Sequence, residues 1–365
     1  MRRLSRRGFL IAITGSAIAV AAGCRPTTSS PAPTAYAPGS SLGTPMATAT
    51  SGGTAIATAP DPKFGQLVYD KRQYTAVPDL YITQYDYSNT PQVDQEAWML
   101  TVDGLVETPL TINYADLLKL PSFEDTRTLE CISDPPNGTL MGNLQLKGID
   151  MKTLLDKAKV KPEATHVRFE AADGYSTSVE LRWITQPNVM LAYEMNGEPL
   201  NATHGFPLRI FTPGLYGQKM PRWITRIEFI DYDYTGFWES RGWSNVAEIK
   251  TKSVIRMPDD RDEVQAGSIA YLQGVAVAGK RKITGVEVQI DDGEWLPAEL
   301  YPGESSLEWT QWSFEWNVPA PGSYRIGVRA TDDTGFVQSS EADGLFGNAY
   351  PNGTDAIHRL VIKSV

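Results

Sequence analysis

The sequence predicts a mixed α+β domain at residues 63–251, followed by an all-β, immunoglobulin-like sandwich at residues 252–365. In the first range, strand-like stretches alternate with short helical stretches. In the second range the helical signal disappears, and short alternating runs are separated by turn residues. At 365 residues, of which 41% are hydrophobic, the chain can bury the cores of two ordinary domains.

Residues 1–23 have the layout of a bacterial secretory signal. Four arginines precede an apolar run from Phe9 to Ala22, which is too short to cross a bilayer as a lasting helix. The stretch S-R-R-G-F-L at residues 5–10 resembles the twin-arginine export signal, which serves proteins that are already folded. A general secretory signal that happens to contain paired arginines is the alternative.

The stretch A-A-G-C that ends at Cys24 resembles a lipoprotein cleavage box. Cys24 would then be the first mature residue and would carry a lipid, whereas the alternative is an incidental cysteine near an ordinary cleavage site. We therefore expect an exported, extracytoplasmic protein that is anchored to the membrane surface through Cys24.

Residues 24–62 are rich in Pro, Thr, Ser, Ala and Gly and lack aliphatic periodicity. Such a segment cannot bury enough apolar surface to offset the entropy lost on ordering, so we expect a disordered linker.

The charge of the chain disfavours nucleic acid as a partner. Asp and Glu outnumber Lys and Arg by 43 to 33, which gives a formal net charge of −10. A phosphate backbone would be repelled by this charge. A negatively charged ligand can bind only where cations are concentrated locally.

Six elements of the first domain can be placed from local patterns. Strand-favouring residues predict strands at 98–102, 167–169, 208–211 and 223–229. Asn113 and Asp150 are residues of the type that caps helices, and they precede predicted helices at 114–118 and 151–155. A further hairpin turn is expected at Met195, Asn196 and Gly197.

The second domain carries a hairpin signature. The alternating run at 283–290 is followed by Asp291-Asp292-Gly293 and then by Trp295-Leu296. Alternation at 324–330 predicts a strand with one buried face. About 110 residues of such strands indicate an immunoglobulin-like sandwich that lacks bridging cysteines.

Cys131 is the residue with the largest number of possible chemical roles. The chain has only two cysteines, so if Cys24 carries a lipid, Cys131 has no partner for a disulfide. Three interpretations compete: a small buried hydrophobe, a nucleophile activated by one of three histidines, or a single thiolate ligand for a soft metal. The sequence has neither Cys-x-x-Cys nor paired histidines for zinc, so such a metal must bring its other ligands.

Five segments carry a resemblance to a known family. In order along the chain they are T-L-E-C-I-S-D (128–134), F-E-A-A-D-G-Y (169–175), L-A-Y-E-M-N-G-E-P-L (191–200), H-G-F-P-L-R (204–209) and P-G-L-Y-G-Q-K-M-P-R-W-I (213–224). Together they resemble the molybdopterin-binding domain of the sulfite oxidase family, and the C-terminal sandwich resembles that family's dimerisation domain. The resemblance implies a molybdenum–molybdopterin cofactor, with Cys131 as the catalytic residue that supplies a thiolate to the metal.

The resemblance also implies which residues bind the cofactor. Within the matched segments and the loop that corresponds to the family's first cofactor loop, these residues are Gln84, Tyr85, Asp173, His204, Arg209, Lys219, Met220, Pro221 and Arg222. The basic residues among them would supply the local cations that a phosphate needs in an acidic protein. The alternatives are surface salt bridges for the arginines and a turn-forming role for Asp173. Trp238 and Trp243 are expected in the core.

The resemblance weakens at the substrate. At the positions of two arginines of the family, this chain has Pro136 and either Gln84 or Tyr85. The position of the family's tyrosine falls near Trp243. We expect oxygen-atom transfer to or from a small oxyanion or sulfur-oxo compound, with sulfite oxidation as the leading candidate. A reductase of sulfoxides or of another oxo substrate is one alternative, and a non-catalytic extracytoplasmic binding protein is another. An external electron carrier such as a cytochrome and a homodimer through the C-terminal domain are also expected.

Overall fold

The computed structural model describes residues 59–68, 74–88 and 90–365. The expected signal, the expected lipidation site Cys24 and most of the expected linker lie outside these residues. The described residues belong to one unit of the chain, Gly53–Val365. None of the described helices is long and apolar enough to cross a membrane.

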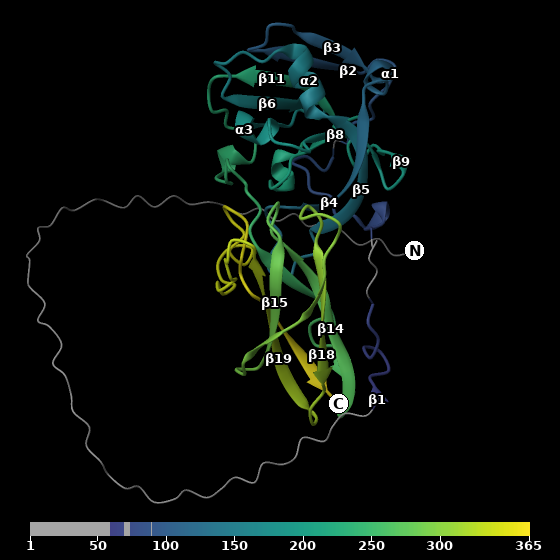
Figure 1. Cartoon of the computed structure of the whole chain (residues 1–365), viewed down its shortest axis with the longest axis vertical. Helices are drawn as coiled ribbons and strands as arrows, with labels where there is room; N and C mark the ends of the chain where they lie inside the picture. The colour runs from purple at the N-terminus through teal and green to yellow at the C-terminus, as the bar shows by residue number, and fades with distance from the viewer. Residues whose placement is uncertain (1–58, 69–73, 89) are drawn as a thin grey trace, which may run out of the picture. The chain divides into compact units, whose positions relative to one another are not determined.

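The first half of the described chain is built from two five-stranded sheets (Figure 1). One contains, in spatial order, β3 (Leu110–Asn113), β2 (Met99–Gly104), β11 (Ile224–Ile230), β6 (His166–Ala171) and β7 (Ser176–Glu180). The other contains β10 (Arg209–Phe211), β8 (Met190–Met195), β5 (Met141–Asp150) and β4 (Ser122–Glu130), with β9 (Glu198–Pro199) paired to β8.

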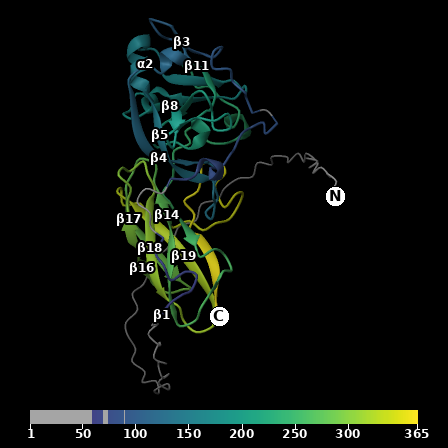
Figure 2. The ribbon, with the colours of Figure 1, turned by 90° about the vertical axis from the view of Figure 1, so that its right-hand side faces the viewer.

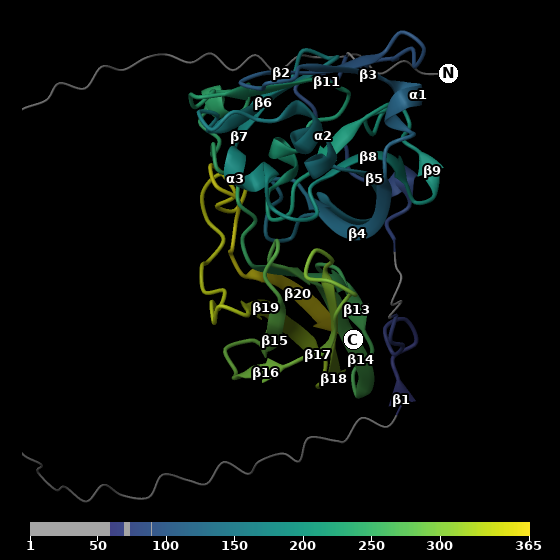
Figure 3. The ribbon, with the colours of Figure 1, turned by 45° about the horizontal axis from the view of Figure 1, so that its top comes forward.

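Helices are few and short in this half. They are α1 (Tyr114–Leu117), α2 (Met151–Ala158), α3 (Leu181–Ile184) and the 3₁₀ helices η1 (Val77–Asp79), η2 (Gly217–Lys219) and η3 (Glu239–Arg241). Figure 3 shows α2 between the sheet of β2 and β11 and the sheet of β5 and β8. Leu154 of α2, Leu100 of β2 and Ile149 of β5 are fully buried in one apolar core. The α+β domain is thus mostly sheet.

The second half is a sandwich of two five-stranded sheets (Figure 2). One sheet contains β1 (Ala59–Pro60), β14 (Ser268–Val277), β18 (Thr310–Asn317) and β17 (Glu299–Tyr301), with β12 (Lys252–Met257) paired to β14. The other contains β13 (Glu263–Val264), β20 (His358–Ser364), β19 (Gly322–Asp332), β15 (Ile283–Ile290) and β16 (Trp295–Pro297). Trp312 from the first sheet and Val328 from the second share one core.

The elements predicted from local patterns are confirmed. Asn113 caps α1, since its Oδ1 accepts from the Asp116 N–H at 2.7 Å, and Asp150 caps α2 by accepting from Lys152 N–H at 2.8 Å. The hairpin predicted at 283–296 is formed by β15 and β16. Asn196 and Gly197 adopt φ angles of 53° and 81°, as the expected turn between β8 and β9 requires.

The start of the described chain differs from the predicted domain limits. Ala59 and Pro60 pair in parallel with β14, beside which β1 lies in Figure 1, and Phe64 is buried in the sandwich core. Residues 59–64 therefore belong to the sandwich, although the sequence analysis divided them between the linker and the first domain. Edge pairing to a strand more than 200 positions away leaves no local pattern in a stretch this short.

Burial of His358 makes the sandwich sensitive to acid. The ring Nδ1 accepts from the Ile255 N–H at 3.0 Å, so the ring is neutral. Burial, together with the positive charges of Arg256 and Lys252, lowers the pKa of His358 to about 4, against smaller opposing effects of Asp259 and Asp260. An unfolded histidine binds a proton at higher pH, near 6.5, so stability is lost as the pH falls from about 6.5 to about 4.

We expect protonation of His358 in the unfolded chain to lower the free energy of unfolding by about 2 kcal/mol between pH 7 and pH 5. Urea unfolding of the protein and of the His358→Gln variant at both pH values measures it. The variant retains an acceptor for the Ile255 N–H but does not titrate, so it should lose less stability on acidification. Equal losses in the two proteins would contradict the prediction.

Candidate cofactor site

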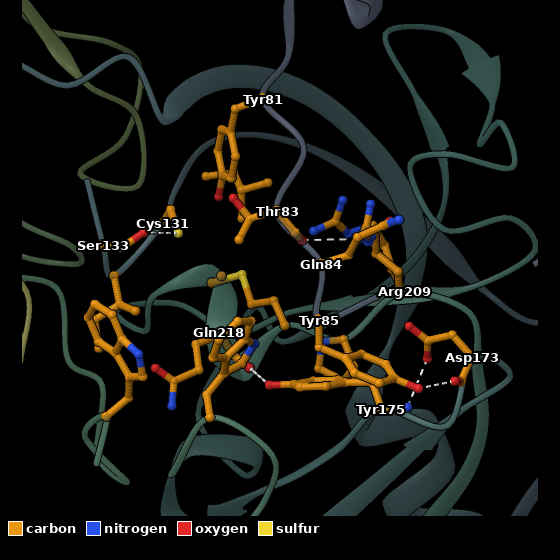
Figure 4. A pocket seen from close by; sticks show the side chains of 18 of the residues that line it. Tyr81, Thr83, Gln84, Tyr85, Cys131, Ser133, Asp173, Tyr175, Arg209 and Gln218 are labelled. Atoms are coloured by element: carbon orange, nitrogen blue, oxygen red, sulfur yellow. Dashed lines mark hydrogen bonds between the residues drawn. The ribbon is translucent and has the colours of Figure 1, made fainter. Parts of the chain in front are cut away.

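A cavity of about 290 Å³ opens beside Cys131 (Figure 4). Its walls come from chain segments at the ends of strands. Cys131 follows β4 directly, Asp173 lies in the turn between β6 and β7, Arg209 begins β10, and Arg222 lies just before β11. The two sheets of the first half therefore bring together residues that are far apart in the sequence.

The thiol of Cys131 is buried and is not activated as a nucleophile. Burial raises the pKa of Cys131, although its Sγ lies 3.2 Å from the hydroxyl oxygen of Ser133. The described residues contain no group of three or more His, Cys, Asp and Glu side chains that could hold a metal ion. A metal bound at Cys131 must therefore bring most of its own ligands.

The turn that carries Cys131 is held in place by a buried lysine. Lys252, at the start of β12, places its Nζ 2.7 Å from Glu130 Oε1 and 2.6 Å from Asp134 Oδ2. All three side chains are almost completely excluded from solvent. Asp134 Oδ1 also accepts from the Leu140 N–H at 2.7 Å, which closes the loop after Cys131. The sandwich thus contributes directly to the geometry of the thiol.

Two arginines line the cavity: Arg209 is buried and Arg222 is partly buried. Arg209 Nη1 donates to the His204 carbonyl at 3.3 Å, and its Nε has no partner among the described residues. Arg222 donates to the Thr203 carbonyl at 2.6 Å and to Gln84 Oε1 at 3.0 Å. Neither guanidinium forms an ion pair within 4.0 Å in the described part of the chain, although the Asp173 carboxylate acts on Arg222 at longer range. Burial and the neighbouring Arg222 lower the pKa of Arg209 to about 9, so an anionic ligand would stabilise both groups.

His204 lines the same cavity as a neutral group. Burial and the positive charge of Arg209 lower the pKa of His204 to about 4. Its Nε2 lies 3.2 Å from the Val77 carbonyl, as a donor in the neutral ring. His204 can therefore donate or accept a hydrogen bond, but at neutral pH it does not add a cation for a phosphate.

Two loops meet through Tyr85 and Asp173. The Tyr85 hydroxyl donates to the Asp173 carbonyl, and its ring lies 4.7 Å from that of Phe237. The Asp173 carboxylate accepts from the Tyr175 N–H at 3.0 Å, and the Tyr175 hydroxyl donates to the Gln218 carbonyl at 2.8 Å. Figure 4 shows this chain of contacts along one wall of the cavity.

Nearly all the residues that the sequence analysis assigned to the site line this cavity. They are Cys131, Gln84, Tyr85, Asp173, His204, Arg209, Met220, Pro221 and Arg222. The alternative of surface salt bridges for the arginines is contradicted, because Arg209 is buried and Arg222 is partly buried in the cavity wall, and neither has a carboxylate within 4.0 Å among the described residues. Trp238 and Trp243, which were expected in the core, also line the cavity and are only partly buried.

Lys219 is the exception. Its side chain is completely buried and donates to Glu239, to Thr177 Oγ1 at 3.1 Å and to the Ser178 carbonyl at 2.9 Å. The ammonium group therefore does not line the cavity, and its predicted contact with the cofactor is contradicted. Gln218 and Met220, the neighbours of Lys219 in the chain, line the cavity, whereas the Lys219 ammonium is held by Glu239, which a motif match alone does not reveal.

The sequence analysis missed several wall residues. Ser133, Tyr175 and Gln218 lie inside the matched segments, so their positions could have been inferred from those segments. Tyr81 lies just before the first cofactor loop. Phe346 comes from the C-terminal half of the chain, more than 200 positions from Cys131, and no local pattern indicates its place in the site.

The donor set fits a metal complex that carries an anionic group. The cavity offers one thiol, a guanidinium N–H of Arg209 that has no partner among the described residues, and the guanidinium of Arg222. A molybdopterin needs a soft ligand for its metal and cations for its phosphate. Cys131 at one side and Arg209 at the other (Figure 4) meet both needs.

Comparison with known proteins agrees with this reading of the site. An oxidoreductase molybdopterin binding domain matches residues 87–238, and a Mo-co oxidoreductase dimerisation domain matches residues 244–362. The sulfite oxidase of Arabidopsis thaliana is 26% identical over 338 residues, which cover 74% of this chain and 86% of that protein. The uncharacterized oxidoreductase YuiH of Bacillus subtilis is 34% identical over 150 residues, which cover 41% of this chain and 74% of that protein.

Among solved structures, the sulfane dehydrogenase SoxCD from Paracoccus pantotrophus superposes with a TM-score of 0.65 and 25% identity, over 76% of this chain and 80% of that one. The chain spans 59% of the length of the mitochondrial sulfite oxidases of rat and mouse. The matched domains, their order and the relatives agree with the cavity chemistry. The chain therefore belongs to the sulfite oxidase family of molybdopterin-dependent oxidoreductases, and its cofactor is molybdenum–molybdopterin.

Proposed function

We propose that the protein transfers an oxygen atom to or from a small sulfur compound. The observation that carries the proposal is the position of Cys131, in a cavity that also holds two guanidinium groups without a carboxylate within 4.0 Å among the described residues. When bound, the cofactor supplies a high-valent metal that accepts or gives up an oxygen atom. Membership of an oxidoreductase family contradicts the alternative of a non-catalytic binding protein.

The protein's own residues have distinct roles in this proposal. Cys131 would hold the metal as a thiolate, since coordination would release the proton that burial otherwise keeps on the sulfur. Arg209 and Arg222 bind the anionic end of the cofactor by charge-assisted hydrogen bonds. Tyr85 and Asp173 join two loops of the cavity wall by a hydrogen bond.

Two substrates are in competition. The names of the relatives favour oxidation of sulfite, which takes up an oxygen atom from water and releases two electrons and two protons. The wall near the thiol favours the second candidate, reduction of a sulfoxide or another neutral oxo compound, which consumes two electrons and two protons. Within the described lining, the permanent cations are Arg209 and Arg222, which the cofactor occupies in this proposal.

Steady-state assays of the cofactor-loaded protein separate these candidates. Sulfite is offered with ferricyanide as electron acceptor, and methionine sulfoxide with a reduced viologen as electron donor. We expect turnover in at least one assay, and none from protein produced without molybdate. A preparation with one molybdenum per chain that turns over neither these nor related sulfur compounds would overturn the proposal.

The remaining expectations from the sequence are part of the same proposal. Residues 1–23 direct export by the twin-arginine route, Cys24 carries a lipid, and a domain boundary lies near residue 252. The name of the family model over residues 244–362 supports a homodimer, and the two-sheet sandwich supports an immunoglobulin-like fold. Electrons pass to or from a separate carrier such as a cytochrome.

A further inference from the structure

Two aromatic side chains from different halves of the chain form a wall of the cavity. Trp243, which follows η3, and Phe346, which precedes β20, both line the cavity that contains Cys131. Their rings are stacked, with centroids 6.0 Å apart and an interplanar angle of 27°. Tyr350 packs edge-on against Trp243 at 5.1 Å. The pair therefore presents an apolar surface to whatever enters the cavity.

Trp243 is tied to the turn that bears the thiol. Its ring packs against a small cluster that contains Ile132, the residue directly after Cys131, and Tyr216. Gly242, with a φ of 89°, reverses the chain just before it, and the Trp243 N–H donates to the Trp238 carbonyl at 3.2 Å. The indole is thus held beside the metal-binding residue by buried contacts.

Phe346 is held in an unusual backbone conformation. Its φ is 54°, in the left-handed region that bulky residues rarely adopt. The surrounding loop fixes this conformation, because Asn348 Nδ2 donates to the Glu341 carbonyl at 2.8 Å and Thr354 Oγ1 donates to the Gly347 carbonyl at 2.8 Å. Strained residues of this kind persist where the surroundings hold them, commonly at ligand sites.

The same loop lies against the segment that follows Cys131. A Cβ added at Gly347 would lie 2.5 Å from Pro136 Cδ, so the two segments are in close contact. Half of the Phe346 side chain is nevertheless exposed, although it lines the cavity and touches another aromatic ring. An apolar side chain fixed in this way and left half-exposed is suited to contact with a ligand.

Arg209 and Arg222 are the only lysine or arginine residues in the described lining, and Figure 4 shows Arg209 on the side away from Cys131. Arg241 is close in sequence, but its guanidinium stacks on Phe237 and donates to the Phe237 carbonyl at 2.7 Å. Lys252, which holds the turn of Cys131, is already paired with Glu130 and Asp134. An oxyanion beside Trp243 and Phe346 would find no lysine or arginine in the described lining other than Arg209 and Arg222, whereas an apolar substituent would bury its surface on two rings.

We propose that Trp243 and Phe346 form the specificity wall of the active site and select a neutral sulfur compound with an apolar substituent, of the thioether and sulfoxide class. This inference rests on the proposed function and names its substrate class. Oxygen-atom transfer balances in both directions. A thioether and water give a sulfoxide, two electrons and two protons. In the reverse reaction the external carrier supplies the two electrons. Thioether sulfur also makes favourable contacts with aromatic rings.

Phe346→Arg tests the wall in the cofactor-loaded protein, and Leu345→Arg is its matched control. Leu345 is 60% exposed, does not line the cavity and receives the same change in charge. With methyl phenyl sulfoxide and a reduced viologen, we expect Phe346→Arg to lower kcat/KM at least tenfold, and Phe346→Ala to lower it less. With sulfite, Phe346→Arg should raise kcat/KM severalfold, and high salt should reverse that gain. Leu345→Arg should change neither value.

Equilibrium binding of methyl phenyl sulfoxide to the oxidised, loaded protein gives a readout that does not depend on turnover. We expect Kd to rise at least tenfold in Phe346→Arg and to stay unchanged in Leu345→Arg. Equal effects of the two arginine variants, or no change in Phe346→Ala, would overturn the inference. Failure of the wild-type protein to turn over any sulfur compound, with binding still dependent on Phe346, would overturn the proposed function and leave this wall in place.

Discussion

Replacement of Cys131 by serine is expected to remove the thiolate-to-molybdenum absorption and to lower oxygen-atom transfer by more than about 100-fold. Loss of an outer-shell partner of a metal ligand typically costs about 10–100-fold, and a direct ligand should cost more. A serine hydroxyl is a harder ligand than a thiolate and does not ionise readily, so it suits a sulfur-rich metal shell poorly. The side chains are similar in size and the site is buried, so the fold should be kept.

Ser133→Ala is the matched control for this prediction. The Ser133 hydroxyl lies 3.2 Å from Cys131 Sγ, within the same turn and the same cavity wall. Its loss should leave the absorption band and the molybdenum content in place. Absorption spectra and metal analysis of both variants, produced in cofactor-competent cells, provide the measurement. An unchanged spectrum in Cys131→Ser would remove the basis for assigning Cys131 to the metal.

Local patterns in the sequence were sufficient for much of the fold and for most of the site. Asn113 and Asp150 cap helices through atoms only two or three residues away, so their roles can be read from short stretches. The hairpin of β15 and β16 likewise depends on its own turn. Motif segments place Cys131 and Arg209 in one cavity because such segments keep their positions relative to strand ends.

Features that depend on distant contacts could not be predicted. Lys219 lies in a motif, yet whether its side chain enters the cavity depends on Glu239, whose buried carboxylate pairs with the ammonium. Phe346 enters the site only because the C-terminal loop folds against Pro136. β1 exists only by pairing with β14. In each case the deciding partner is far along the chain or belongs to another element.

Replacement of Lys252 by methionine is expected to destabilise the folded protein by about 3–5 kcal/mol, the range typical of breaking a buried ion pair by removing one partner. The ammonium lies within 2.7 Å of both Glu130 and Asp134, and none of the three side chains is appreciably exposed. Methionine fills a similar volume. The loss of stability therefore measures the cost of leaving two buried carboxylates without a cation.

The pH dependence of this loss has a definite sign. Burial raises the pKa of Glu130 to about 7 even with Lys252 beside it. Removal of the cation raises the pKa further, so the folded variant holds a proton that the unfolded chain releases near its ordinary carboxyl pKa. The free energy of unfolding of Lys252→Met should therefore decrease more than that of the unmodified protein between pH 6 and pH 8.

Urea unfolding at both pH values, compared with Lys250→Met, tests this argument. Lys250 lies two positions earlier, is partly exposed and pairs with Asp355 at 3.7 Å, so its loss should cost less than about 1 kcal/mol. Adding Glu130→Gln and Asp134→Asn to Lys252→Met should recover part of the stability, because neutral amides need no buried cation. Equal losses from Lys250→Met and Lys252→Met would contradict the prediction and would mean that the sandwich holds the turn of Cys131 by packing alone.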